Sequence, residues 1–92
     1  MDRDLKLRGT ILHKLDRKGK WGPVHTSLDN LPKGLPSDLR GEAKAVARAL
    51  IKEGLILEKP TFYGIEVSLN LKRRAEIEEI IDEYLTAAEF ER

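Results

Sequence analysis

The 92-residue chain contains no cysteine. This absence excludes disulfide bonds, thiolate zinc sites and cysteine nucleophiles. Glutamine is also absent, methionine occurs once, and asparagine occurs only as Asn30 and Asn70, whereas charged residues make up 36% of the chain. Such usage is typical of heat-adapted proteins, so we expect a thermophilic source.

Long apolar runs are absent as well. No stretch approaches the roughly 20 apolar residues that a membrane-spanning helix needs, and the N-terminal segment MDRDLKLRG is charged where a signal peptide would be apolar. We therefore expect a cytoplasmic protein that does not associate with membranes. The 40% hydrophobic content suffices for one small core, and we expect residues 1–92 to form a single domain.

Residue patterns for catalysis are missing. The two histidines, His13 and His25, would need carboxylates from distant segments to hold zinc. The triplet His25-Thr26-Ser27 pairs a base with hydroxyls, but adjacent residues seldom point at each other. No phosphate-binding loop of the G-x-x-x-x-G-K-[ST] type is present. We expect no enzymatic activity, no cofactor and no metal.

The net charge of +1 conceals an asymmetry along the chain. Residues 1–52 contain 12 Lys/Arg against 6 Asp/Glu, whereas residues 53–92 contain 5 against 10. A basic N-terminal part suits a polyanionic partner, and the acidic C-terminal part is expected to face away from it.

The spacing of apolar residues and turn formers predicts a mainly helical order of elements. It comprises a helix over 5–18, an extended stretch over 20–24, a short helix through Leu28 and Leu31 capped by Thr26 or Ser27, a helix over 37–53, strands over 55–58 and 65–69, and a helix over about 71–90. Ser37 and Asn70 are expected to cap the helices that follow them. Gly19 and Gly54 are expected to end the helices that precede them.

This order resembles the winged helix-turn-helix superfamily and is similar to its small archaeal DNA-binding and transcription-factor-like members. The likeness covers about residues 5–70 and depends also on the stretch ALIKEGLILEKPTFYG, where a helix ends in Gly-Leu-Ile and a hairpin begins. It implies an α+β, mainly α fold with a three-helix core, a two-stranded wing over 55–69, a short third strand at Trp21–Val24 and a C-terminal helix. It also implies a recognition helix over 37–53 and a wing tip over 59–64.

Basic residues follow one flank of the helix over 37–53 at steps of four: Arg40, Lys44, Arg48 and Lys52. Gly41 and Ala45 lie nearly opposite the apolar face, where small side chains would allow close approach to DNA. Arg40 and Arg48 are the better candidates for reading bases, because arginine binds guanine bidentately, while the lysines suit phosphates. In a lone helix such a row would more often be a solvated face, and the helix-turn-helix context favours DNA contact.

The wing supplies further candidates. Lys59 and Thr61 are expected to contact phosphates, and Phe62 or Tyr63 to pack on sugar or enter the minor groove. We expect one of these aromatics to fold over the core and Tyr63 to be the exposed one.

A second basic cluster lies at the end of the first helix and comprises Arg17, Lys18 and Lys20. It is either a solvated turn or a further contact with a duplex backbone.

The C-terminal helix carries a long apolar stripe that includes Ile77, Ile80, Ile81, Tyr84 and Leu85. Two interpretations are open, since the stripe can pair two copies into a homodimer or can pack against the first helix of the same chain.

These features predict a protein that binds double-stranded DNA and regulates transcription. The alternative is a winged-helix module that binds another protein within a larger assembly, and RNA is a minor variant of the first prediction.

Overall fold

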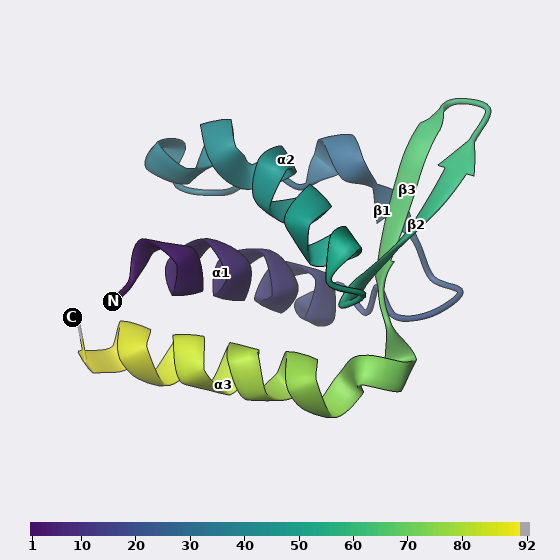
Figure 1. The fold of residues 1–92 in the computed structure, drawn as a ribbon. Helices are drawn as coiled ribbons and strands as arrows, with labels where there is room; N and C mark the ends of the chain where they lie inside the picture. Colours follow the sequence, from purple (N-terminus) through teal and green to yellow (C-terminus); the bar gives the residue numbers. More distant parts are fainter. Residues whose placement is uncertain (91–92) are drawn as a thin grey trace.

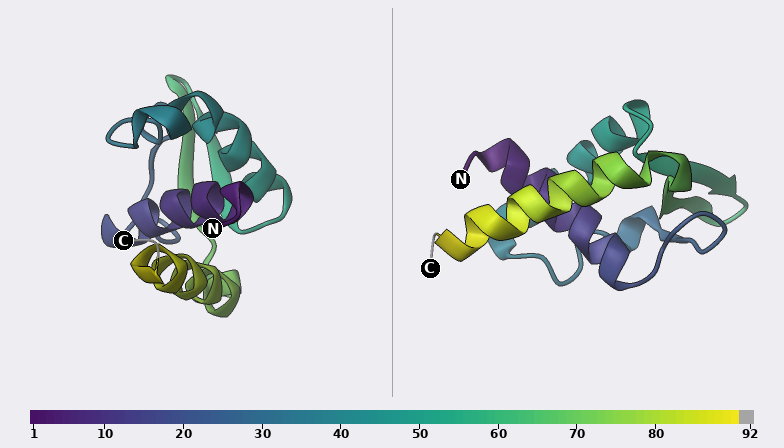
Figure 2. Two further views of the ribbon diagram at one scale, coloured as in Figure 1. Left: turned by 90° about the vertical axis from the view of Figure 1, so that its left-hand side faces the viewer. Right: turned by 90° about the horizontal axis from the view of Figure 1, so that it is seen from below.

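The computed structural model describes residues 1–90, which form the expected α+β fold with three α-helices and a three-stranded antiparallel sheet (Figure 1). The elements are α1 (Arg3–Arg17), β1 (Thr26–Ser27), the 3-10 helix η1 (Leu28–Asn30), α2 (Ser37–Lys52), β2 (Ile56–Thr61), β3 (Gly64–Leu69), the 3-10 helix η2 (Leu71–Arg73) and α3 (Arg74–Phe90). α1 lies between α2 and α3, and the β2–β3 hairpin projects from one end of this stack (Figures 1 and 2).

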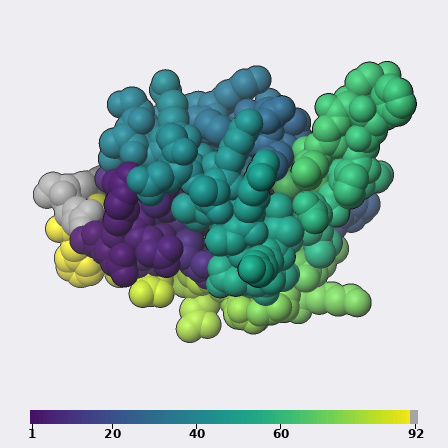
Figure 3. Space-filling model, turned by 45° about the horizontal axis from the view of Figure 1, so that its top comes forward, coloured from purple at the N-terminus to yellow at the C-terminus, as the bar shows by residue number. Residues whose placement is uncertain are grey.

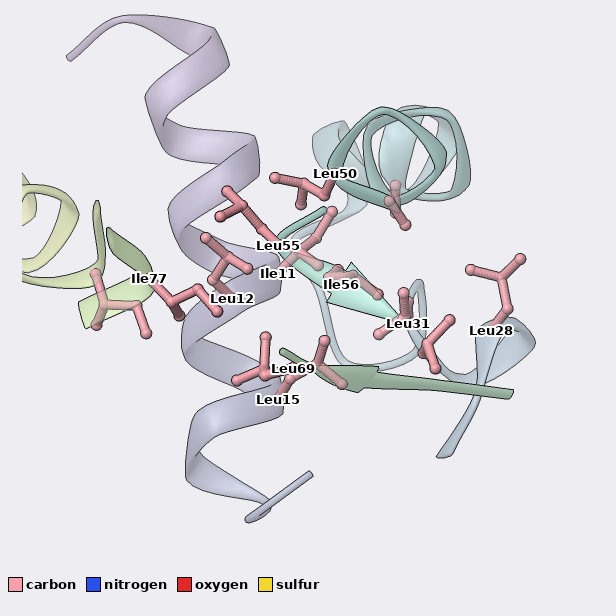
Figure 4. Close-up of a cluster of buried hydrophobic side chains, with 14 of the residues drawn as sticks. Ile11, Leu12, Leu15, Leu28, Leu31, Leu50, Leu55, Ile56, Leu69 and Ile77 are labelled. Atoms are coloured by element: carbon pink, nitrogen blue, oxygen red, sulfur yellow. The ribbon is translucent and has the colours of Figure 1, made fainter. Parts of the chain in front are cut away.

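α1 is the central helix because its apolar side chains point in more than one direction. Ile11, Leu12 and Leu15 are fully buried and contribute to a core shared with α2, the sheet and α3 (Figure 4). The helix begins two residues earlier than expected, because the carboxylate of Asp2 accepts a hydrogen bond of 2.8 Å from the backbone N–H of Asp4.

α2 ends as expected at Gly54, whose positive φ of 83° disfavours other residues. Its start differs from the prediction. Ser37 is the first helical residue, and Pro36 occupies the cap position without a side-chain hydrogen bond. Pro36, with φ at −53°, leads into the helix, and its carbonyl accepts a hydrogen bond of 2.9 Å from the N–H of Leu39.

The two 3-10 turns are capped as the sequence predicts. Ser27 Oγ accepts from the N–H of Asp29 at 3.2 Å, which starts η1. The side chain of Asn70 accepts from the N–H of Lys72 at 3.0 Å, which starts η2 before α3 begins. The short second helix is therefore a single 3-10 turn.

The hairpin is longer and its turn tighter than the sequence suggests. The paired register runs from Ile56↔Leu69 to Thr61↔Gly64, so the connection is Phe62-Tyr63 and the expected loop over 59–64 is wrong. Pro60 is tolerated inside β2 because β2 is an edge strand, where the absent N–H removes no sheet hydrogen bond.

The third strand is also displaced from its expected place at Trp21–Val24. Trp21 makes a single parallel bridge with Leu69, and the strand proper is Thr26–Ser27, which pairs antiparallel with Val67 and Glu66. The turn at Gly22 and Pro23 redirects the chain before antiparallel pairing begins.

α3 packs along α1 through a very close contact. A Cβ atom placed on Gly9 of α1 would lie 2.3 Å from both Cβ and Cγ of Tyr84. The ring of Tyr84 also lies 6.2 Å from that of His13, centroid to centroid. Glycine at position 9 is therefore a requirement of helix packing.

Candidate nucleic-acid interface

The acidic flank of α2 faces α1, and its carboxylates form ion pairs with cations of that helix. Three ion pairs join the helices: Arg3–Glu42, Lys6–Asp38 and Arg8–Glu53. Arg3 Nη2 lies 2.8 Å from Glu42 Oε1 and also donates to the carbonyl of Asp38 at 3.0 Å. The hydrogen bond to Glu53 raises the pKa of Arg8, which is the most shielded of the three cations. These contacts draw the carboxylates of α2 toward α1 and away from its outer side.

The first half of the cationic row is engaged within the chain. Arg40 Nε donates to the carbonyl of Leu35 at 2.8 Å, so part of the guanidinium is committed to the connection before α2. Lys44 Nζ lies 2.5 Å from Asp29 Oδ1, and this contact lowers the pKa of the Asp29 carboxyl. Arg40 and Lys44 are thus less available to a ligand than their spacing suggests.

The second half of the row is open. Arg48 and Lys52 are exposed and have no ion-pair partner among residues 1–90. Gly41 and Ala45 are exposed on the same outer side, and a Cβ on Gly41 would meet nothing within 4 Å. The outer side of α2 therefore combines free cations with short side chains.

The hairpin tip projects clear of the body beside α2 (Figure 3). Phe62 and Tyr63 are each 96% exposed, so the expectation that one of them covers the core is wrong. The tight turn holds both aromatic rings beyond the reach of the core, and they contact each other edge to face with centroids 5.6 Å apart.

The other two candidates in the hairpin have neighbours of their own. Thr61 Oγ1 donates to the carbonyl of Gly64 at 2.7 Å and accepts from the N–H of Tyr63, so it stabilises the turn. Lys59 is exposed but lies directly across from Glu66 in the strand register. Lys59 remains accessible, with a carboxylate on the adjacent strand.

The basic cluster at the end of α1 lies apart from the outer side of α2. Arg17 and Lys18 line a hollow with the connection 33–36, and that connection and the C-terminal half of α2 lie on opposite sides of the molecule (Figure 2, left). Lys20 is half-buried, and its carbonyl accepts from the N–H of Leu69 at 2.7 Å. The structure therefore does not unite the three predicted basic groups.

The apolar stripe of α3 is used largely within the chain. Ile77 is fully buried and Ile81 is 4% exposed, both in the core with α1. Ile80 and Tyr84 are half-buried, and Leu85 is 40% exposed. Ile77 and Ile81 are thus unavailable for an interface between copies, and the homodimer stays a prediction.

Two residues that shape these surfaces have no clear signal in the sequence. Asp29 neutralises Lys44 from η1, and Lys33 brings a charge beside α1 from the following connection. The positions of Asp29 and Lys33 both depend on how segments distant in the sequence pack together. The helical spacing of Lys14 with Arg17 and Lys18 is the one local pattern that indicates a shared basic face.

The described residues contain no group of three or more His, Cys, Asp or Glu side chains placed to hold a metal ion. Within 1–90, no helix has both the length and the hydropathy to cross a membrane. Comparisons of the chain with protein-family models, curated proteins and solved structures find no match.

Proposed function

We propose that the protein binds double-stranded DNA as a winged helix-turn-helix regulator, with α2 as the recognition helix and the β2–β3 hairpin as the wing. The carrying observation is the separation of charge around α2. Its acidic flank is bound by cations of α1, whereas Arg48 and Lys52 extend outward without partners among the described residues. A helix of this kind presents a positive outer side to a polyanion.

The outer side of α2 suits the major groove. Gly41 and Ala45 leave space around the helix backbone, so the helix can approach base edges closely. Arg48 is the candidate for bidentate contact with guanine, and Lys52 is the candidate for a phosphate. Arg40 and Lys44 add to the positive potential of this surface, although Arg40 donates to the carbonyl of Leu35 and Lys44 pairs with Asp29.

The hairpin supplies a second contact in this proposal. Its tip stands clear of the body, with Tyr63 and Phe62 exposed and Lys59 further down the same strand pair. Exposed aromatic side chains at a wing tip can pack on sugars or enter the minor groove, and a lysine beside them can bind phosphate.

Charge reversal tests the proposal directly. Binding of a fluorescent random-sequence duplex is measured by anisotropy for the wild type, for Arg48→Glu and for the matched control Lys72→Glu, whose lysine is exposed on η2. Arg48→Glu is expected to weaken binding by about tenfold or more, since it removes a cation and places an anion against the phosphates. The control is expected to change affinity far less, and neither substitution should alter the melting temperature appreciably.

Salt dependence provides an independent measurement. Log K should fall linearly with log salt concentration, with a slope of about 0.9 for each phosphate neutralised. Arg48→Glu should reduce that slope while Lys72→Glu should not. Failure of the wild-type protein to bind any duplex at low salt would refute the proposal.

A second candidate function is protein docking through the hairpin tip. The observation in its favour is the pair of aromatic rings, each 96% exposed, at Phe62 and Tyr63, because exposed aromatics are enriched at protein interfaces. The double variant Phe62→Ser/Tyr63→Ser distinguishes the two functions. It should abolish docking to a protein partner, whereas duplex binding through α2 should fall only partly.

A further inference from the structure

A hollow of about 390 Å³ lies between the second half of α1 and the connection that leads into α2. Its lining residues are Thr10, Lys14, Arg17, Lys18, Lys33, Gly34, Leu35 and Pro36. Four of them are cations, and no carboxylate belongs to the lining within the described part of the chain. The hollow is thus a concave surface, and half of its lining residues are positively charged.

The cations come from two walls. Lys14, Arg17 and Lys18 follow one face of α1 at spacings of three and four residues, and Lys33 lies across from them on the connection. Among residues 1–90 none of these four cations makes an ion pair, and the pKa of Lys14 is lowered by burial and then by the nearby charges of Lys18 and Lys33. The carboxylate of Asp29 lies outside the hollow, and Lys33 helps to lower its pKa. Repulsion among the four cations is relieved when an anion enters.

Hydrogen bonds join the two walls of the hollow. Lys14 Nζ donates to three backbone carbonyls of the facing segment, those of Asn30 at 2.6 Å, Leu31 at 3.1 Å and Lys33. Since an ammonium group has three hydrogens, Lys14 supplies charge and fixes the wall, and it has no donor left for a ligand. Direct contacts therefore depend on Arg17, Lys18 and Lys33, of which Lys33 Nζ uses one donor on Asn30 Oδ1 at 3.1 Å.

The start of α2 adds to the field. Pro36 lines the hollow and is the cap residue of α2, and no side chain within residues 1–90 caps the first N–H groups of that helix. The N-terminal end of a helix carries partial positive charge. Leu35 and Pro36 also give the hollow an apolar wall beside its cations.

We propose that this hollow binds a small molecule that carries a phosphate group. Phosphate offers a multiple negative charge and several acceptor oxygens, which suits cations that converge from two walls. The volume lies at the lower end of the range for small-ligand pockets. The connection 33–36, which forms one wall of the hollow, lies on the side of the molecule away from the C-terminal half of α2 (Figure 2, left), so this proposal does not depend on DNA binding.

The experiment is a titration followed by amide NMR at constant ionic strength, with sodium chloride as the balancing salt. Inorganic phosphate, pyrophosphate and adenosine monophosphate are added separately. Saturable shifts confined to the amides of 14–18 and 33–37 are expected, together with a higher melting temperature. Tighter binding of the nucleotide than of inorganic phosphate would place its organic part on Leu35 and Pro36, whereas equal affinities would assign the site to the phosphate group alone.

Variants make the assignment specific. Lys33→Ala and Arg17→Ala should each weaken binding by about tenfold, because each removes a charge-assisted hydrogen bond. The control Lys72→Ala removes one exposed cation from η2 and should leave affinity unchanged. Shifts that do not saturate, equal losses in the control, or displacement of the small ligand by duplex DNA at the same amides would each overturn the proposal.

Discussion

The two sides of α1 are joined to their neighbours by different means. Toward α3 the contact is apolar and close, with Ile77 buried and Gly9 against Tyr84. Toward α2 the apolar contact is edged by ion pairs such as Arg3–Glu42. α1 therefore packs against α3 through a close apolar contact and against α2 through an apolar contact bordered by ion pairs.

The difference determines what each neighbour leaves exposed. α2 directs its carboxylates to α1 and holds its cations outward. α3 directs its isoleucines to α1 and leaves an acidic surface, with Glu79, Asp82 and Glu83 exposed. A polyanion would be attracted to the α2 side and repelled from the α3 side, which gives a preferred orientation for any such partner.

The largest expected effect contrasts two members of the α3 stripe. Ile77→Ala should lower the free energy of unfolding by about 2–5 kcal/mol, because it leaves a cavity in the core. Leu85→Ala should cost less than about 1 kcal/mol, since Leu85 is 40% exposed. Urea denaturation followed by circular dichroism measures both values.

The same pair of variants tests self-association. If Leu85→Ala were as destabilising as Ile77→Ala, and the loss depended on protein concentration, the stripe would join two copies. Light scattering near 10.5 kDa at micromolar concentration would instead indicate a monomer.

The next effect contrasts two glycines inside helices. Gly9→Ala should destabilise the protein by about 1–3 kcal/mol, because the added Cβ would lie 2.3 Å from atoms of Tyr84. Gly41→Ala should instead stabilise it by about 0.5–1 kcal/mol, because alanine favours helix and the position is open. Thermal and urea denaturation of the two variants provide the measurement. Equal stabilisation by both would show that α3 does not approach α1 at Gly9.

Local patterns predict much of this fold. The spacing of three and four residues places α2 correctly to within a residue at its end, and Gly54 and Asn70 mark the boundaries that follow it. These features depend on backbone preferences and on side chains a few residues apart. The predicted positions of the third strand and of the wing loop are wrong. The pairing of strands in the sheet decides where strands form, and Pro23 and Pro60 alone do not.

The candidate site is less predictable than the fold. The helical spacing of residues in α2 places its acidic and basic side chains on different flanks. Whether each cation is free depends on partners that are distant in the sequence. Lys44 meets Asp29 from 15 positions earlier, and Arg40 meets the carbonyl of Leu35 at a turn. Lys33 approaches Lys14 for the same reason, through a connection whose course is set by tertiary packing. Sequence spacing identifies such residues but not their contacts.

The smallest expected effect concerns Lys44, which among residues 1–90 is the one outward cation of α2 that forms an ion pair. Because Lys44 lowers the pKa of Asp29, the pair contributes stability above the unfolded pKa of about 3.9 and loses it as the pH falls through the lower folded value. In Lys44→Met the pKa of Asp29, measured by carbon-13 NMR, should rise toward that unfolded value. High salt should reduce the difference, since the pair is exposed to solvent. An unchanged Asp29 pKa in Lys44→Met would show that Lys44 is free, in which case Lys44 would be available to a polyanion together with Arg48 and Lys52.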